Sequence, residues 1–190
     1  MEMTSPRENA APLAARWESF LALDDDDPRE LIDGRLVEVE VPTELHEWVV
    51  ACLVASLFAW GRTNGGMALG SGYKVRVDDE RGVMPDVQFY RKGRVPSAAR
   101  GLEPRVPDLV VEVVSPSSRQ YDRVIKLRWY AQIGAPEYWL VDPEAGTVER
   151  LVLAADGYQI AEALTGDAQF APPSFPGLSI ALAELFTLPT

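Results

Sequence analysis

A single carboxylate lies within one of the most apolar runs of this 190-residue chain. Glu112 lies within the segment Leu109–Val114, whose remaining residues are all leucine or valine. A continuous apolar run of this length predicts a central strand of an α/β sheet, buried on both faces. An unpaired charge in such a strand costs several kcal/mol or more, so Glu112 requires a proton, a cation or a metal ion.

A second carboxylate, Asp86, lies in another candidate strand, over Met84–Tyr90, and both strands begin with a Pro-Asp pair. Because side chains alternate along a strand, Asp86 shares a face with Gln88. If the two strands are neighbours, Asp86 and Glu112 converge on one cation. Hard oxygen ligands of this kind suit Mg²⁺ or Mn²⁺ rather than zinc.

The helix expected after the second strand, over 119–133, adds a basic group. Its apolar residues form one stripe on a helical wheel, made of Tyr121, Ile125, Trp129, Tyr130 and Ile133. Asp122 and Lys126 fall inside that stripe, although a lysine on the core side of a helix is uncommon. Lys126 either pairs with Asp122 or reaches Glu112, where its ammonium orients a water or stabilises transition-state charge. The second is favoured, because Glu112 otherwise lacks a partner.

The charge of the chain is unevenly distributed. A net charge of −11 argues against a simple nucleic-acid coat protein. Residues 91–128 nevertheless contain nine basic and four acidic residues, so an anionic substrate can be guided to this part. Arg119 and Arg123 are candidates for substrate binding, as are the basic residues of the long 91–107 connection. The alternative, a solvated loop and helix face without a ligand, stays open.

Several kinds of site are excluded by composition. Cys52 and His46 are the only residues of their types, which rules out an internal disulfide and zinc sites rich in cysteine or histidine. A lone histidine at a helix start more often caps or packs than acts as a general base. No stretch is long and apolar enough to span a bilayer, so no membrane partner is expected. Cysteine usage and the absence of a signal peptide favour the cytoplasm.

The order of elements predicts one domain over 13–190, preceded by a mobile tail over 1–12. A helix is expected over 13–23, a hairpin with an Asp-Gly turn over 30–39, and a long helix from the N-cap Thr43 to about residue 62. The glycines between residues 65 and 72 are interpreted as turns. Strands are expected near 72–77, 84–90, 108–114, 137–142, 147–153, 158–163 and 178–180.

These segments resemble the putative restriction endonuclease family, a bacterial branch of the PD-(D/E)XK nucleases. The resemblance covers nearly the whole chain after the tail, and the order and spacing of its motifs make it specific. Its motifs are residues 30–34, 85–87, 107–117 and 134–142, with His46, Asp122, Lys126 and Tyr130.

The resemblance implies a restriction endonuclease-like mixed β-sheet flanked by helices, and Mg²⁺- or Mn²⁺-dependent hydrolysis of phosphodiester bonds in DNA. Asp86 and Glu112 take metal-ligand roles, with the Val113 backbone carbonyl as a third ligand. Val114 stands where the general signature has a lysine. In this family the lysine is thought to lie on the following helix, which makes Lys126 its replacement.

Two further acids and an alternative function complete these expectations. Glu30 or Asp108 is expected to hold a second metal ion or its water shell; otherwise Glu30 is an exposed strand charge and Asp108 caps the strand entrance. The departure at Val114 also fits a catalytically degenerate module that binds nucleic acid or a protein partner. A homodimer is expected, with the aromatic C-terminal hairpin as a candidate interface.

Overall fold

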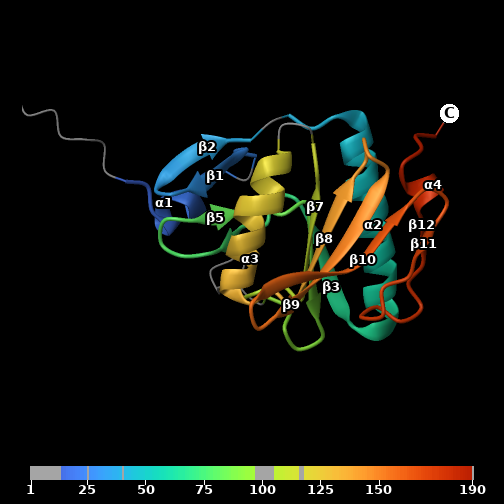
Figure 1. Ribbon diagram of the computed structural model, residues 1–190. Helices are drawn as coiled ribbons and strands as arrows, with labels where there is room; N and C mark the ends of the chain where they lie inside the picture. Colours follow the sequence, from blue (N-terminus) through green and yellow to red (C-terminus); the bar gives the residue numbers. More distant parts are fainter. Residues whose placement is uncertain (1–13, 25, 40, 97–104, 116–117, 190) are drawn as a thin grey trace, which may run out of the picture.

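A six-stranded mixed sheet forms the centre of the protein (Figure 1). The computed structural model describes residues 14–24, 26–39, 41–96, 105–115 and 118–189. Strands follow the order β10-β9-β8-β7-β6-β3, in which β7 and β8 are parallel and all other neighbours are antiparallel. The strands are β3 (Gly66–Gly70), β6 (Val87–Arg91), β7 (Leu109–Val113), β8 (Glu137–Asp142), β9 (Thr147–Ala154) and β10 (Gly157–Thr165).

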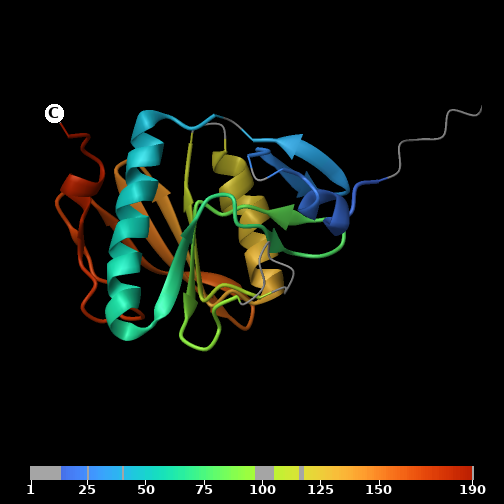
Figure 2. The same cartoon turned by 180° about the vertical axis from the view of Figure 1, so that it is seen from behind.

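Helices cover both faces of this sheet, as Figures 1 and 2 show from opposite sides. The long helix α2 (Glu44–Asn64) lies on one face. The other face carries a helical segment made of the π-helical turn η2 (Tyr121–Lys126) and α3 (Leu127–Ile133), which connects β7 to its parallel neighbour β8. The mixed sheet with helices on both faces agrees with the predicted architecture.

Alternation along β7 divides the interior into two cores. Leu109, Val111 and Val113 pack in the core beneath α2. Val110 packs in the core beneath α3, together with Leu140 of β8. All five residues of β7 are buried, which confirms the prediction of a strand buried on both faces.

A smaller sheet of order β2-β1-β5-β4 lies beside η2 and α3 (Figure 1). Its hairpin turns through Asp33 and Gly34, whose φ angles of 46° and 73° are the positive values that such a turn requires. This confirms the predicted Asp-Gly hairpin. The elements of this region are α1 (Trp17–Leu21), β1 (Arg29–Ile32), β2 (Arg35–Glu38), β4 (Val75–Arg76) and β5 (Gly82–Val83).

Helix α2 begins where the sequence predicts. Thr43 has an extended backbone and its hydroxyl accepts a hydrogen bond from the His46 amide at 3.2 Å. Such a side-chain cap satisfies one of the free amides of the first helical turn. The prediction for the segment that follows the helix is wrong, because Gly66–Gly70 forms strand β3 and only Val75–Arg76 remains of the strand expected over 72–77.

Gly66 shows why this strand escaped prediction. Its φ of 142° suits glycine, and a Cβ atom added there would lie 2.4 Å from the ring of Phe89. The glycine therefore allows β3 and β6 to approach closely, rather than marking a turn. A glycine-rich strand also lacks the apolar alternation by which strands are recognised.

The C-terminal segment packs beside α2 (Figure 2). It contains β11 (Gln169–Phe170), β12 (Ile180–Ala181) and α4 (Leu182–Leu185). Phe170 and Phe175 are buried against Trp139 in the core of the same chain. These aromatic side chains are therefore not available as the predicted dimer interface, and the homodimer itself stays a prediction.

Two segments with predicted properties lie outside the described residues. They are the tail over 1–12 and the middle of the 91–107 connection, which includes Arg100. Among the residues that the structure describes, no helix has the length and apolar character needed to cross a membrane.

Candidate active site

The two carboxylates that the sequence singles out lie opposite each other on adjacent strands. β6 and β7 pair in antiparallel register with Val87 opposite Val111. Asp86 precedes this pair by one residue and Glu112 follows it by one, so both side chains project from the same face of the sheet. The amide of Val113 donates a hydrogen bond to Asp86 Oδ2 at 2.7 Å. The predicted juxtaposition of the two carboxylates is thus present.

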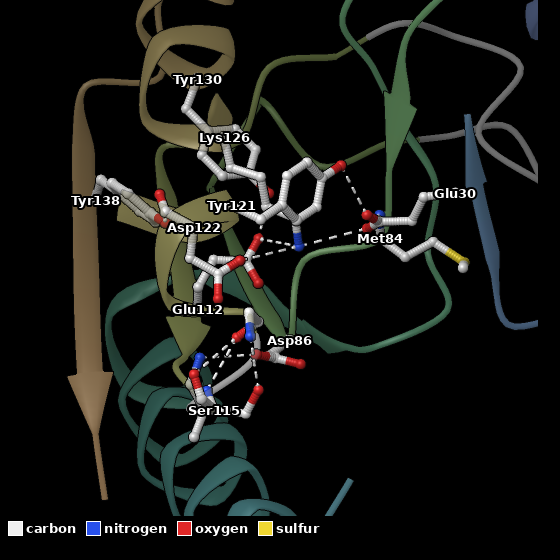
Figure 3. Close-up of polar contacts among 12 residues, drawn as sticks. Glu30, Met84, Asp86, Glu112, Ser115, Tyr121, Asp122, Lys126, Tyr130 and Tyr138 are labelled. Carbon is white, nitrogen blue, oxygen red and sulfur yellow. Dashed lines mark hydrogen bonds and ion pairs between the residues drawn. The ribbon is translucent and has the colours of Figure 1, made fainter. Parts of the chain in front are cut away.

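Lys126 reaches this face from η2 and lies between three carboxylates (Figure 3). Its Nζ is 3.1 Å from Glu112 Oε1, and 3.5 Å from both Glu30 Oε1 and Asp122 Oδ1. The two pairings considered for Lys126, with Asp122 and with Glu112, therefore occur together. With 6% of its surface exposed, Lys126 is a buried cation in an acidic cluster.

Burial and charge act in opposite directions on Lys126. Burial alone would lower its pKa, but the three carboxylates, with Glu112 first, raise the pKa of Lys126 well above its ordinary value. The ammonium therefore keeps its proton and acts as a cation rather than as a base. Burial raises the pKa of Glu112 well above its usual range; Lys126 opposes this shift, and Asp122, Asp86 and Glu30 reinforce it. These surroundings favour the protonated form of Glu112, so a further cation beside it would stabilise its charged form.

Glu30 joins the cluster from the smaller sheet. It is 1% exposed, so the alternative of an exposed strand charge is wrong. Its Oε1 accepts a hydrogen bond from the Met84 amide at 2.8 Å, and its Oε2 accepts one from the Tyr121 hydroxyl at 3.0 Å. Glu30 therefore links the smaller sheet to both η2 and the strand that carries Asp86.

Two buried tyrosines make different contacts in the cluster (Figure 3). The Tyr130 hydroxyl donates to Glu112 Oε1. The Tyr138 hydroxyl donates to the backbone carbonyl of Asp122 at 3.1 Å. Burial raises the pKa of both hydroxyls well above the usual value, and the charge of Glu112 adds to the shift, so both remain protonated donors. The wheel pattern had placed Tyr130 only in an apolar stripe.

The π-helical turn η2 determines which side chains face the cluster. Ile125 was predicted in the apolar stripe, but it is 38% exposed and the prediction is wrong. A π-helical turn contains more residues per turn than an α-helix, so the wheel of 3.6 residues fails across it. Asp122 and Lys126, which the wheel also placed in the stripe, are both buried. Such turns are often found at functional sites.

His46 is a neighbour of Asp86 that the sequence did not reveal. Its Nε2 lies 3.4 Å from Asp86 Oδ2 and its Nδ1 lies 3.6 Å from Glu47 Oε1. Burial opposes protonation, but Asp86 and Glu47 outweigh it and raise the pKa of His46. The capping pattern predicted where α2 begins, but it could not predict that this end of the helix lies beside Asp86.

The arginines predicted to bind substrate are engaged with acids of the chain. Arg119 contacts Asp142 and Glu144, each at 3.1 Å. Arg123 donates to both carboxylate oxygens of Glu149, at 3.0 and 2.9 Å. Their role in substrate binding stays a prediction, since a phosphate would have to compete with these acids.

Asp108 is separated from the cluster. It lies just before β7, at the end of the strand opposite to Glu112. Its Oδ2 accepts a hydrogen bond from the Arg91 amide at 2.8 Å, and its Oδ1 lies 3.2 Å from Arg94 Nε. The expectation that Asp108 holds a second metal ion is therefore wrong, and its alternative role at the strand entrance fits these contacts.

The residues present fit a hard divalent cation by charge and by donor chemistry. Three carboxylates, those of Glu30, Glu112 and Asp122, surround the single positive charge of Lys126. Within the described ranges, no group of three or more His, Cys, Asp or Glu side chains is arranged to hold a metal ion. A metal ion at this place would therefore be held by few side chains, as in the predicted set of Asp86, Glu112 and the Val113 carbonyl.

Comparison with known proteins identifies the family. Residues 17–183 match the model of the Uma2 family, described as putative restriction endonuclease. The chain belongs to this family. No curated protein matches the Uma2 chain. A crystal structure described as a putative nuclease belonging to DUF820, from Anabaena variabilis, matches with a TM-score of 0.71 and 22% identity, over 89% of this chain and 96% of that one.

The structural match confirms the predicted restriction endonuclease-like fold. The Uma2 family is described as putative restriction endonuclease, and restriction endonuclease-like nucleases generally use divalent metal ions. The side chains of Asp86 and Glu112, from adjacent strands, and Lys126, from η2, lie together on one side of the sheet of this Uma2 protein.

Proposed function

We propose that this Uma2 protein is a metal-dependent endonuclease that hydrolyses phosphodiester bonds of DNA. One observation carries the proposal: Asp86 and Glu112 occupy facing positions on adjacent strands, and the Lys126 ammonium lies 3.1 Å from Glu112. Acidic oxygen donors can hold a metal ion, and a buried cation can stabilise the negative charge that develops when an anionic ester is hydrolysed. The description of the family as restriction endonuclease supports DNA as the substrate.

Asp86, Glu112 and the Val113 carbonyl are the groups that hold Mg²⁺ or Mn²⁺ in this proposal. What such an ion supplies is charge neutralisation at the scissile phosphate and a lowered pKa for a water molecule. Hard carboxylate and carbonyl oxygens are the donors that both ions prefer.

The side chains of the cluster have separate tasks. Lys126 stays protonated, so it orients a nucleophilic water or stabilises negative charge that develops on the phosphate, and it does not remove a proton. Glu30 holds Lys126 and the amide of Met84 in place. His46 lies beside Asp86 Oδ2 and steadies that carboxylate from the side of α2.

A cleavage assay with a matched pair of variants tests the proposal. Purified protein with Mg²⁺ or Mn²⁺ is expected to cleave DNA, and supercoiled, linear and single-stranded DNA are compared with RNA. Asp86→Asn should lower the rate on the order of 1,000-fold, since a metal ion contributes several kcal/mol to such a transition state. Asp108→Asn is the control, because Asp108 follows a proline as Asp86 does but lies outside the cluster. Intact nucleic acid under all conditions would refute the proposal.

A second candidate function is a catalytically degenerate module that binds nucleic acid or a protein partner. Two observations favour it. Val114 replaces the strand lysine of the general signature. In the described part of the chain, no group of three or more His, Cys, Asp or Glu side chains is arranged so that it could hold a metal ion. In that case wild type and Asp86→Asn would bind the same partner equally well, and neither would cleave it.

A further inference from the structure

Both donors that contact Glu112 converge on the same oxygen. Lys126 Nζ lies 3.1 Å from Oε1, and the Tyr130 hydroxyl donates to that same atom. Lys126 and Tyr130 are four residues apart along one helical segment, so both donors approach from the helix side. The carboxylate is thereby turned with Oε1 toward the helix, which leaves its second oxygen for the strand side, where Asp86 lies.

The two donors differ in how firmly they can fix this orientation. Lys126 has a flexible side chain and divides its charge among three carboxylates. Tyr130 has a rigid ring that is completely buried and packs against the ring of Tyr138, with centroids 5.2 Å apart. A tyrosine ring has only two rotatable side-chain bonds, so its hydroxyl has little freedom once the ring is packed. Tyr130 is therefore the donor that sets the rotation of Glu112.

We propose that Tyr130 is a positioning residue that orients the Glu112 carboxylate toward a divalent cation shared with Asp86. This inference rests on the proposed nuclease function and adds to it a residue that touches neither the substrate nor the metal. Partners of metal ligands typically change metal affinity or activity 10- to 100-fold when removed, because they hold the ligand in its binding orientation.

Tyr138 offers a matched control in the same core. Both tyrosines are completely buried, and each donates one hydrogen bond through its hydroxyl. Tyr130 donates to the Glu112 carboxylate, whereas Tyr138 donates to a backbone carbonyl, that of Asp122. Replacing either one with phenylalanine removes one buried hydroxyl at nearly constant volume. The two variants therefore share the structural cost and differ in the contact to Glu112.

The experiment measures Mn²⁺ binding by calorimetry, DNA cleavage as a function of Mn²⁺ concentration, and thermal unfolding, for wild type, Tyr130→Phe and Tyr138→Phe. Tyr130→Phe is expected to weaken Mn²⁺ binding roughly 10- to 100-fold, with much of the cleavage rate restored at high Mn²⁺ concentration. Tyr138→Phe should bind Mn²⁺ as the wild type does.

Different results would refute the role of Tyr130 and the proposed nuclease function. A wild type that binds no Mn²⁺ and cleaves nothing refutes the nuclease function and this inference with it. A wild type that binds Mn²⁺ and cleaves DNA, with equal effects of the two tyrosine variants, overturns the role of Tyr130 alone. A Tyr130→Phe protein that fails to fold while Tyr138→Phe folds would also overturn it, because Tyr130 would then be structural.

Discussion

The two faces of the strand pair β6–β7 have opposite character although their residues alternate along the same backbone. Toward α2, Phe89 and Val111 are completely buried in an apolar core. Toward η2, Asp86 and Glu112 project into a cluster of charges around Lys126. The comparison shows that one strand pair contributes to an apolar core on one side and to a charged cluster on the other, since side chains alternate between the two faces.

The energetic consequences of the two faces differ as well. Each apolar side chain buried beneath α2 stabilises the fold by about 1.5–3 kcal/mol. On the η2 face, burial opposes the charged forms of Glu112 and Asp122, and the attraction to Lys126 offsets this only in part. A cluster of this kind is weak evidence for stability, so we attribute its presence to function.

Replacement of Lys126 should produce the largest loss of stability. Lys126→Met leaves Glu30, Glu112 and Asp122 without their shared counter-ion. Breaking a buried ion pair by removing one partner costs about 3–5 kcal/mol, so the free energy of unfolding should fall by that amount in urea denaturation. A second substitution, Glu112→Gln, removes one of the uncompensated charges and should recover part of the loss. A change below about 1 kcal/mol would mean that the cluster is better solvated than its burial indicates.

Two substitutions in β7, one toward each face, should affect stability and Mn²⁺ binding separately. Leu109→Ala removes a buried side chain beneath α2 and should lower the free energy of unfolding by about 2–5 kcal/mol, with Mn²⁺ binding by the folded protein unchanged. Glu112→Gln should abolish Mn²⁺ binding without lowering stability at neutral pH, because it removes a charge whose burial is unfavourable. Urea denaturation and calorimetry measure both quantities. The comparison fails if Leu109→Ala weakens Mn²⁺ binding as much as Glu112→Gln does.

The smallest expected effect is on the reactivity of the Cys52 thiol, which lies on the α2 side of the sheet. Cys52 packs against the α2 core, and burial alone raises its pKa. The thiolate fraction at a given pH is therefore lower than in a free thiol, and alkylation by iodoacetamide should be slower in the folded protein than in urea. Because no charged neighbour contributes to this shift, added salt should leave the folded-state rate unchanged. A clear salt dependence would indicate that charges act on this face too.

Local patterns in the sequence predicted the central features of the site. The apolar run around Glu112 indicated a buried strand, and the alternation of side chains placed Asp86 on the same face of the sheet as Glu112. The position of Lys126 on the core side of its helix indicated that it contacts Glu112. These predictions succeeded because each depends on the period of a single element or on the cost of burying a charge.

The remaining features depend on contacts between distant segments or on irregular backbone. Glu30 reaches Lys126 across 96 positions of the chain, and His46 reaches Asp86 only because the start of α2 adjoins the edge of β6. The exposure of Ile125 follows from the π-helical turn, which a wheel of 3.6 residues does not represent. Strand β3 lacks apolar alternation, so no periodic signal marked it.

A crystal structure with Mn²⁺, collected to record its anomalous scattering, can show whether Asp86 and Glu112 share a cation. We expect one strong anomalous peak between the two carboxylates, with oxygen distances of about 2.0–2.3 Å. In crystals of Glu112→Gln grown under the same conditions the peak should be absent. An empty position between Asp86 and Glu112 in the wild type, with Mn²⁺ bound elsewhere or nowhere, would show that these carboxylates do not form a metal site.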